Sequence, residues 1–389
     1  MFQSTVDEKA AIELLKELVK IDSVNPSLVP GAKGETEIAE YVAQWLKALG
    51  LKAKVDKIEK NRCNAVGTLK GVGGGRSLML NGHIDTVGYD YMTIDPLKPV
   101  VKDGKMYGRG TFDMKGGLVA SLAALKANVD SGTQLLGDVV IAAVCDEEYA
   151  SIGTERVMEK TRVDAAIVGE PSALQIERCH KGFAWIDVDT KGLAAHGSMW
   201  HVGVDAITEM GKVLMGLETL GTKLQKKKHF LVGPASVHAG TIKGGLGLST
   251  YPDKCLLQIE RRLIPGEEKK DVENEMEKLL KGIADKDPKF SASYEIIFYR
   301  GSMDVPETSE ICQTIVTCSK EAIKLTPAFT GGSGWLDTQI IWSKGIPAVA
   351  YGPAGDGAHA AVEWVDLDTV MDAARVQELV LQRFCGVKV

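Results

Sequence analysis

Four strongly apolar runs of strand length constrain the fold more than any other feature of this sequence. They lie at 78–80, 138–145, 163–168 and 346–351, and a histidine or an acidic residue follows each. Near-continuous apolar strands are typical of a parallel sheet that helices bury on both faces. The sequence therefore predicts an α/β fold with a mixed, mostly parallel sheet and helices on both of its faces.

A change of pattern in the middle of the chain predicts a second domain. Alternating apolar and polar residues at 184–189 and 254–261 indicate amphipathic strands, and helical periodicity appears at 202–220 and 267–283. A sheet with one partly solvated face gives this alternation. We therefore expect residues 177–299 to form an inserted α+β domain. Residues 1–176 and 300–389 are expected to form one catalytic domain around it.

The residues that follow the apolar runs are of the types that bind metal ions. His83 and Asp85 follow the first run, Glu147 and Glu148 the second, Glu170 the third and His359 the fourth. In open α/β sheets ligands bind at the carboxyl ends of the strands, so these side chains are expected to meet. Asp113 stands where a helix is predicted to begin, and a simple N-cap is the alternative explanation for it.

Together these side chains offer two imidazoles and three carboxylates, in His83, Asp113, Glu148, Glu170 and His359. This donor set suits Zn²⁺, with Co²⁺ or Mn²⁺ as alternatives. Five donors exceed the need of one open catalytic site, but they fit two ions that share a bridging carboxylate. The neighbouring Glu147 can then act as the base that takes a proton from water.

Composition excludes several other kinds of partner. The net charge is -6 and the one basic run, 226–229, is short, which argues against nucleic acid. No apolar stretch reaches the ~18 residues that a membrane span needs. The seven cysteines are odd in number and form no C-x-x-C motif, and the N-terminus lacks an apolar signal-peptide segment. We therefore expect free thiols and a cytoplasmic protein.

Six short motifs occur in a fixed order along the chain. They are 82–87, 108–117, 146–148, 169–171, 195–198 and 358–359. In this order they resemble the co-catalytic zinc amidohydrolase and exopeptidase family of acetylornithine deacetylase, succinyl-diaminopimelate desuccinylase and bacterial glutamate carboxypeptidase. The resemblance covers nearly the whole chain and implies a metallo-exopeptidase-like catalytic domain.

The resemblance also implies a role for each metal ligand. His83 and Glu170 would hold one ion, Glu148 and His359 would hold the other, and Asp113 would bridge the two. A cis peptide bond is implied after the bridging residue, between Asp113 and Met114.

Two further residues near the metals receive catalytic roles from the same resemblance. Asp85 would orient His83 through its carboxylate. Glu147 would activate the water and then protonate the leaving amine.

The inserted segment resembles the lid, or dimerisation, domain of this family, which implies a homodimer. His196 would stabilise the oxyanion, in some relatives from the partner subunit, and a surface histidine is the alternative. Arg262 would clamp a substrate carboxylate, with a salt bridge to Glu260 as the alternative. Ser249 stands where relatives usually have asparagine, which argues against a substrate contact at this position. In the 331–337 loop the glycines lie farther from the aspartate than in relatives, so we expect the substrate pocket to differ in that loop.

The expected activity is metal-dependent hydrolysis of an amide bond in an N-acyl amino acid, of the deacetylase or desuccinylase type, with two divalent ions per chain. A dipeptidase or carboxypeptidase with the same site is the alternative. A relative that binds metal or ligand without catalysis is a remote alternative. It is disfavoured because Glu147 and all five ligands are present.

Overall fold

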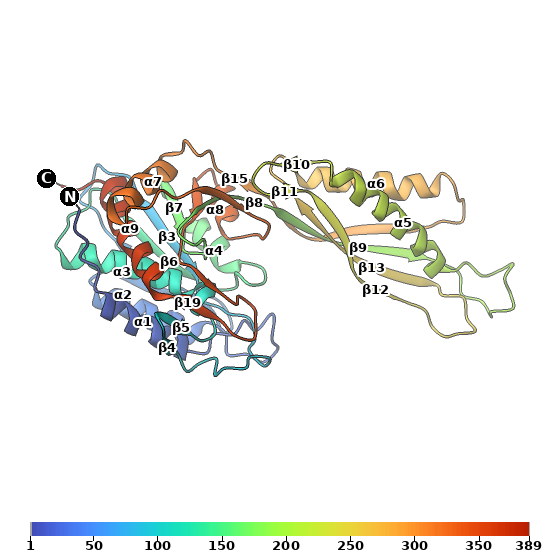
Figure 1. Cartoon of the computed structure of the whole chain (residues 1–389). Helices are drawn as coiled ribbons and strands as arrows, with labels where there is room; N and C mark the ends of the chain where they lie inside the picture. The colour runs from blue at the N-terminus through green and yellow to red at the C-terminus, as the bar shows by residue number, and fades with distance from the viewer. Residues whose placement is uncertain (1, 389) are drawn as a thin grey trace. The chain divides into compact units, whose positions relative to one another are not determined.

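The computed structural model describes residues 2–388, which form two compact units (Figure 1). The second unit comprises Cys179–Asp304 and Gly331–Trp335, and the rest of the chain forms the first. The expected insertion, 177–299, therefore differs from the second unit at both ends. The expected insertion also omits the short segment 331–335, which belongs to the second unit. The local sequence pattern does not indicate that this segment belongs there.

The first unit is built on a mixed sheet whose central strands are parallel. Its order begins β1 (Lys52–Glu59), β2 (Arg62–Leu69), β6 (Val139–Val144), β3 (Leu78–His83), β7 (Ala165–Val168) and β17 (Ala348–Ala350). Strand β3 runs parallel to both β6 and β7, and β17 runs parallel to β7, whereas β1 and β2 are antiparallel. This confirms the mostly parallel sheet, and the four central strands are the four apolar runs.

Three more strands, β8 (Ile176–His180), β15 (Met303–Asp304) and β16 (Phe329–Gly332), lie where the chain passes from one unit to the other. A small antiparallel sheet of the first unit contains β4 (Val100–Lys102), β5 (Lys105–Tyr107), β18 (Gly355–Asp356) and β19 (Trp364–Asp366). In this small sheet β19 pairs with β5, which brings the segment that follows His359 beside the segment that precedes Asp113.

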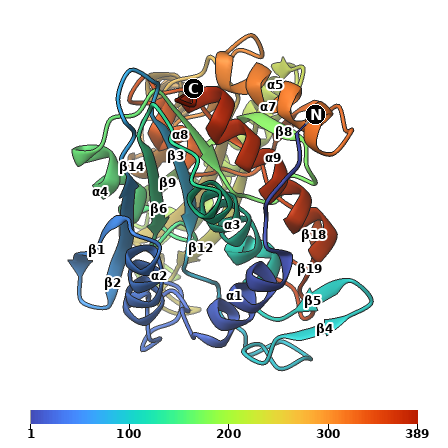
Figure 2. The ribbon, with the colours of Figure 1, turned by 90° about the vertical axis from the view of Figure 1, so that its left-hand side faces the viewer.

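Helices cover both faces of the large sheet. They are α1 (Glu8–Lys20), α2 (Thr36–Ala48), α3 (Gly116–Asp130), α4 (Ile152–Lys160), α7 (Glu310–Ala322), α8 (Thr338–Trp342) and α9 (Leu367–Cys385). Helices α3 and α9 pack against each other, with α1 beside them, as Figure 2 shows. Helix α4 packs against α8.

Strand β3 shows why the central runs are apolar almost throughout. Asn81 donates from Nδ2 to Thr154 Oγ1 of α4 at 3.2 Å. The next residue, Gly82, faces α3 and the turn before it, because a Cβ at this position would lie 3.4 Å from Leu118 Cβ and 2.8 Å from Met114 Cε. Successive side chains of a strand point to opposite faces. Both faces of β3 are therefore buried, and neither can be lined with solvated polar residues.

The second unit has an antiparallel sheet that is covered on one face. Its order is β12 (Ser236–Gly244), β13 (Lys254–Leu263), β9 (Gly182–Lys191) and β14 (Ala292–Arg300), with a hairpin of β10 (Lys228–His229) and β11 (Gly233–Pro234) beside it. Alternate residues of β9 pack against α5 (Ala206–Leu224) and α6 (Lys269–Ala284) in one core. This agrees with the α+β character read from the alternating pattern.

All seven cysteines are free and buried, as expected from their number and spacing. Within residues 2–388 no helix combines the length and apolar character that crossing a bilayer would require.

Candidate active site

Five potential metal ligands meet at the carboxyl edge of the large sheet, all within the first unit. His83 is the last residue of β3, Glu148 follows β6 and Glu170 follows β7. Asp113 lies in a kinked turn, Thr111–Lys115, immediately before α3, and its own backbone there is not helical. His359 lies between β18 and β19. Parallel strands end at the same edge of a sheet, so residues far apart in sequence are brought together.

Asp113 lies between the two histidines. Its Oδ1 is 3.0 Å from His83 Nε2, and its Oδ2 is 3.4 Å from His359 Nε2. Each histidine also faces one more carboxylate. Glu170 Oε1 lies 3.6 Å from His83 Nε2, and Glu148 Oε2 lies 2.9 Å from His359 Nε2. The five side chains therefore form two groups of three, and Asp113 belongs to both.

The charge at this site is far from balanced. Burial raises the pKa of Glu170 well above its usual range, and Asp113 and Glu148 raise it further. Burial and the charge of Asp113 raise the pKa of Glu148 to about 6. Hydrogen bonds to Asp113 and Glu148 raise the pKa of His359 to about 10. A dense set of carboxylates with imidazoles among them is what two divalent cations would neutralise.

One polar atom of the site supports the fit to metal ions directly. Glu170 Oε1 is buried and has no hydrogen-bond donor among residues 2–388. A buried carboxylate oxygen is costly unless a donor or a cation satisfies it. The residues present therefore fit the divalent metals that their donor types suggest.

A close backbone contact sets the position of Asp113 relative to Glu170. A Cβ at Gly117, near the start of α3, would lie 1.6 Å from Gly169 O. Only glycine allows the helix to approach the end of β7 so closely.

The peptide bond between Asp113 and Met114 is cis, as the resemblance implied.

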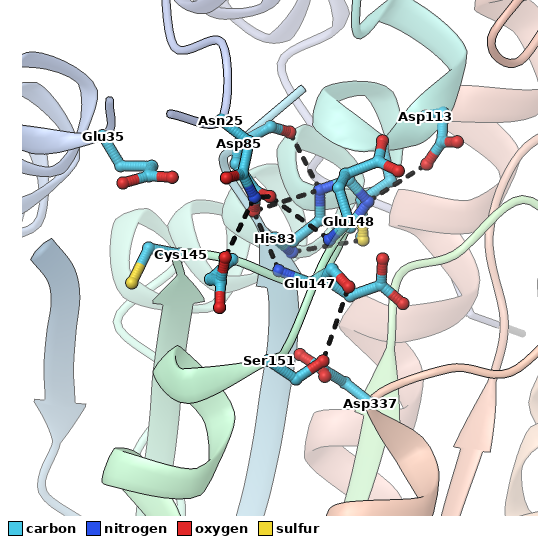
Figure 3. Close-up of polar contacts among 12 residues, drawn as sticks. Asn25, Glu35, His83, Asp85, Asp113, Cys145, Glu147, Glu148, Ser151 and Asp337 are labelled. Carbon is cyan, nitrogen blue, oxygen red and sulfur yellow. Dashed lines mark hydrogen bonds and ion pairs between the residues drawn. The ribbon is translucent and has the colours of Figure 1, made fainter. Parts of the chain in front are cut away.

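Asp85 contacts more of the site than its expected partner, His83 (Figure 3). His83 Nδ1 lies 3.0 Å from the backbone oxygen of Asp85 and 3.7 Å from its carboxylate Oδ1. That carboxylate also accepts the backbone N–H groups of Glu147 and Glu148 at 3.1 and 3.2 Å. Asp85 therefore holds the turn that carries both glutamates, in addition to contacting the histidine.

A buried polar network behind Asp85 was absent from the sequence-based expectation. Asn25 Nδ2 donates to Asp85 Oδ2 at 2.8 Å and to Asp146 Oδ1 at 3.1 Å. Arg62 pairs with Asp146, and its Nε lies 3.0 Å from Glu35 Oε2. Asn25 and Glu35 lie in a segment that reads as an ordinary loop between two helices. The sequence carries no signal that these residues are buried together.

Asp337 is a further buried carboxylate that the sequence analysis left without a role. Its Oδ2 accepts a hydrogen bond from Thr154 Oγ1 at 2.5 Å. Burial raises its pKa to about 6. Figure 3 shows it beyond Ser151, on the side of Glu147 that faces away from Asp85. The unusual spacing of the 331–337 loop was the only sequence signal that pointed to this position.

Three other candidate residues, His196, Ser249 and Arg262, belong to the second unit. His196 is exposed, and its Nδ1 lies 2.9 Å from Ser198 Oγ. The backbone of Ser249 pairs with the same loop, since Gly197 N donates to Ser249 O at 2.8 Å. Within this unit the structure therefore brings Ser249 and His196 together.

Arg262 forms the salt bridge that was the alternative to a substrate clamp. Its Nε and Nη2 donate to the two carboxylate oxygens of Glu260 at 2.6 and 3.2 Å. Its guanidinium also lies over the Phe183 ring, 5.1 Å from the centroid.

A separate group of metal-type side chains in the second unit has a different geometry. Cys179 Sγ lies 3.6 Å from His229 Nδ1, whereas Asp304 Oδ2 lies 3.3 Å from Nε2. The cysteine and the aspartate thus face opposite nitrogens of one ring. Of these two residues, an ion bound to Nδ1 would have only Cys179 in place as a second ligand, and an ion bound to Nε2 would have only Asp304.

Comparison with known proteins agrees with this geometry. The profile of Peptidase family M20/M25/M40 matches residues 79–383. An acetylornithine deacetylase of Myxococcus xanthus is 29% identical over 385 residues, which cover 96% of this chain and 97% of the relative. Similar solved structures include aminopeptidase PepT of Bacillus cereus, with TM-score 0.80, 18% identity and coverage of 98% and 99% of the two chains.

Another similar structure is a dinuclear metal-binding M20 peptidase of Bacillus subtilis, with TM-score 0.70 and 15% identity, covering 97% of this chain and 98% of the other. The family profile covers most of the chain, and the matched range includes all five residues that meet at the sheet edge. The protein therefore belongs to peptidase family M20/M25/M40 and is a metal-dependent hydrolase of C–N amide bonds.

Proposed function

We propose that this protein hydrolyses the amide bond of a small N-acyl amino acid at a centre of two divalent metal ions. The observation that carries the proposal is the position of Asp113, with one carboxylate oxygen facing each histidine. The similarity to the acetylornithine deacetylase of M. xanthus over nearly the full length of both chains supports the N-acyl amino acid class.

His83, Glu170 and one oxygen of Asp113 would hold the first ion. His359, Glu148 and the other oxygen of Asp113 would hold the second. The all-nitrogen and oxygen donor set favours Zn²⁺, with Co²⁺ or Mn²⁺ as alternatives. When bound, such a pair of ions lowers the pKa of a water molecule and polarises the substrate carbonyl.

Glu147 would serve as the general base and then as the general acid. It takes a proton from the attacking water and delivers it to the departing amine. Its backbone N–H donates to Asp85, which fixes the turn next to the ligands. Burial, together with the charge of Glu170, raises the pKa of Glu147 well above the usual glutamate range. A raised pKa suits a group that must both accept and return a proton near neutral pH.

Two residues of the second unit would also act on the substrate. His196 would donate to the oxyanion that forms during attack, and its exposure leaves the ring accessible for this role. Arg262 would bind a substrate carboxylate, which must then compete with Glu260 for the guanidinium.

We also propose a homodimer formed through this unit. Strand β12 lies at the edge of its sheet and is mostly exposed. Three apolar residues on or just beyond it are largely or fully exposed, namely Ile242, Leu246 and Leu248. An open edge with apolar neighbours is a template for pairing with a second chain.

The seven free cysteines support the cytoplasm as the compartment.

The test is a substrate panel with defined metal loading. The protein is stripped with a chelator, reloaded with Zn²⁺ or Co²⁺, and assayed on N-acetyl, N-succinyl and N-formyl amino acids alongside dipeptides. We expect metal-dependent release of an amine from an N-acyl amino acid. Hydrolysis of dipeptides alone would move the protein to the peptidase alternative, and turnover that survives complete metal removal would contradict the proposal.

A further inference from the structure

Glu363, which has no role in the chemistry above, receives four hydrogen bonds from one segment. It is completely buried, at 0% exposure. Its Oε1 accepts the backbone N–H groups of Phe112 and Asp113 at 2.9 and 3.1 Å. Its Oε2 accepts Gly110 N at 3.0 Å and Arg109 Nη1 at 2.6 Å. One carboxylate thus holds the whole turn that ends at the bridging ligand.

The contact is reciprocal, because Arg109 holds the loop that carries His359. Arg109 Nη2 donates to Ala360 O at 3.3 Å, and Ala360 directly follows His359. The same guanidinium donates to Gly88 O at 3.3 Å, in the segment that follows β3. Gly108 N also donates to the backbone oxygen of Glu363 at 3.1 Å. Each of the two ligand-bearing loops is therefore anchored by a side chain of the other.

The two loops that Glu363 and Arg109 connect carry Asp113 and His359. The proposed metal centre depends most on the spacing of these two ligands. Asp113 contributes to both groups of ligands. His359 has a side chain that is 53% exposed, so packing around its ring does little to fix its position. Metal coordination tolerates ligand displacements of only a few tenths of an ångström. The distance between Asp113 and His359 must then be set from outside the ligand set.

We propose that Glu363, with Arg109, is the positioning residue that fixes the spacing of the bridging carboxylate and His359, and so sets the affinity for the metal pair. This inference rests on the proposed function, since it concerns the same metal centre. Partners that orient the primary ligands commonly change metal affinity or activity 10–100-fold when they are replaced. The competing explanation is that this buried ion pair serves stability alone.

The hydrogen-bond chemistry supplies a sharp variant. All four partners of the Glu363 side chain are donors, and an ionised carboxylate can accept from all of them. Glu363→Gln has the same shape, but in either amide orientation its NH₂ group faces two donors. Glu378→Gln is the matched control, because Glu378 is also buried in the first unit and accepts hydrogen bonds from Ser4 and Thr5.

The experiment measures metal affinity without substrate, by competition of Zn²⁺ or Co²⁺ with a chelator, together with Tm, kcat and KM. We expect Glu363→Gln to weaken binding of the metal pair about 10–100-fold and to lower kcat with little change in KM. Glu378→Gln should lower Tm while its metal affinity stays that of the wild type. Glu363→Asp, which keeps the charge, should recover part of the affinity.

The inference is overturned if Glu363→Gln lowers Tm as Glu378→Gln does and binds metal as the wild type does. If Glu363→Gln does not fold, Arg109→Lys provides the test of the positioning role. Lysine keeps the positive charge beside Glu363 but cannot also reach Ala360. We expect weakened metal binding for Arg109→Lys, and unchanged binding would refute the positioning role of Glu363 and Arg109. A wild-type protein that binds no metal pair would instead refute the proposed function, so the two failures are distinguishable.

Discussion

Replacing Glu147 with glutamine separates its proposed role as the base from a role as a metal ligand. The structure makes this a real question, because Glu147 lies within ligand reach of His83 together with Glu170. Glutamine has nearly the same size, and its backbone N–H can still donate to Asp85 Oδ1. The turn should therefore keep its shape, and the change should remove only the ability to accept a proton.

The size of the effect follows from what remains at the site. General base catalysis contributes about 10²–10⁴-fold, or ~3–5.5 kcal/mol at 1.36 kcal/mol per tenfold. The other carboxylates near the histidines, Asp113, Glu148 and Glu170, are assigned to the metals. Asp337 already accepts a hydrogen bond from Thr154. Because the three carboxylates near the histidines are assigned to the metals, we expect a loss in the upper part of the range, about 10³–10⁴-fold in kcat.

The assay combines kcat on the best substrate of the panel with metal content by elemental analysis. We expect Glu147→Gln to keep about two ions per chain, whereas Glu170→Gln should lose one. The reasoning would be refuted if Glu147→Gln lost an ion while Glu170→Gln kept both, since the two glutamates would then exchange roles. Substantial remaining activity in Glu147→Gln would remove it as the base.

Two other perturbations test parts of the account outside the ligand set. His196→Ala should lower kcat by about 10²–10³, as the loss of one oxyanion donor does, and an unchanged kcat would leave His196 an ordinary surface residue. Burial, with a contribution from Asp85, raises the pKa of Glu35 from 4.5 to about 9, so the native protein keeps a proton that the unfolded chain loses. Stability from this group is full below about pH 4.5 and falls as the pH rises towards 9. Glu35→Gln should therefore show a smaller decrease in Tm between about pH 6 and about pH 8 than the wild type, and identical decreases in thermal unfolding scans would contradict the assignment.

The parts of the fold that the sequence predicted are those with local signals. The apolar runs of β3, β6, β7 and β17 are visible because both faces of each strand are buried. Ligands lie at or within a few residues of the ends of three of these strands, so their meeting at one edge could be inferred from chain order and parallel pairing. Helix α9 was not predicted, although it buries much of its length against α3.

The parts that the sequence did not predict are buried polar contacts between distant segments. Glu363 follows His359 by four residues, but nothing local shows that its partners lie at 109–113. The network of Asn25, Arg62 and Asp146 has the same character. A polar residue in a loop looks the same in sequence whether it is solvated or buried, and only the packed structure supplies its partner.

The central claim is that Asp113 bridges two metal ions held by nitrogen and oxygen donors alone. X-ray absorption spectroscopy of the Zn²⁺- or Co²⁺-loaded protein tests it most directly. We predict a metal–metal distance of about 3.5–4 Å with no sulfur in the first shell. A spectrum of isolated ions without that distance, or one with sulfur ligands, would contradict the claim.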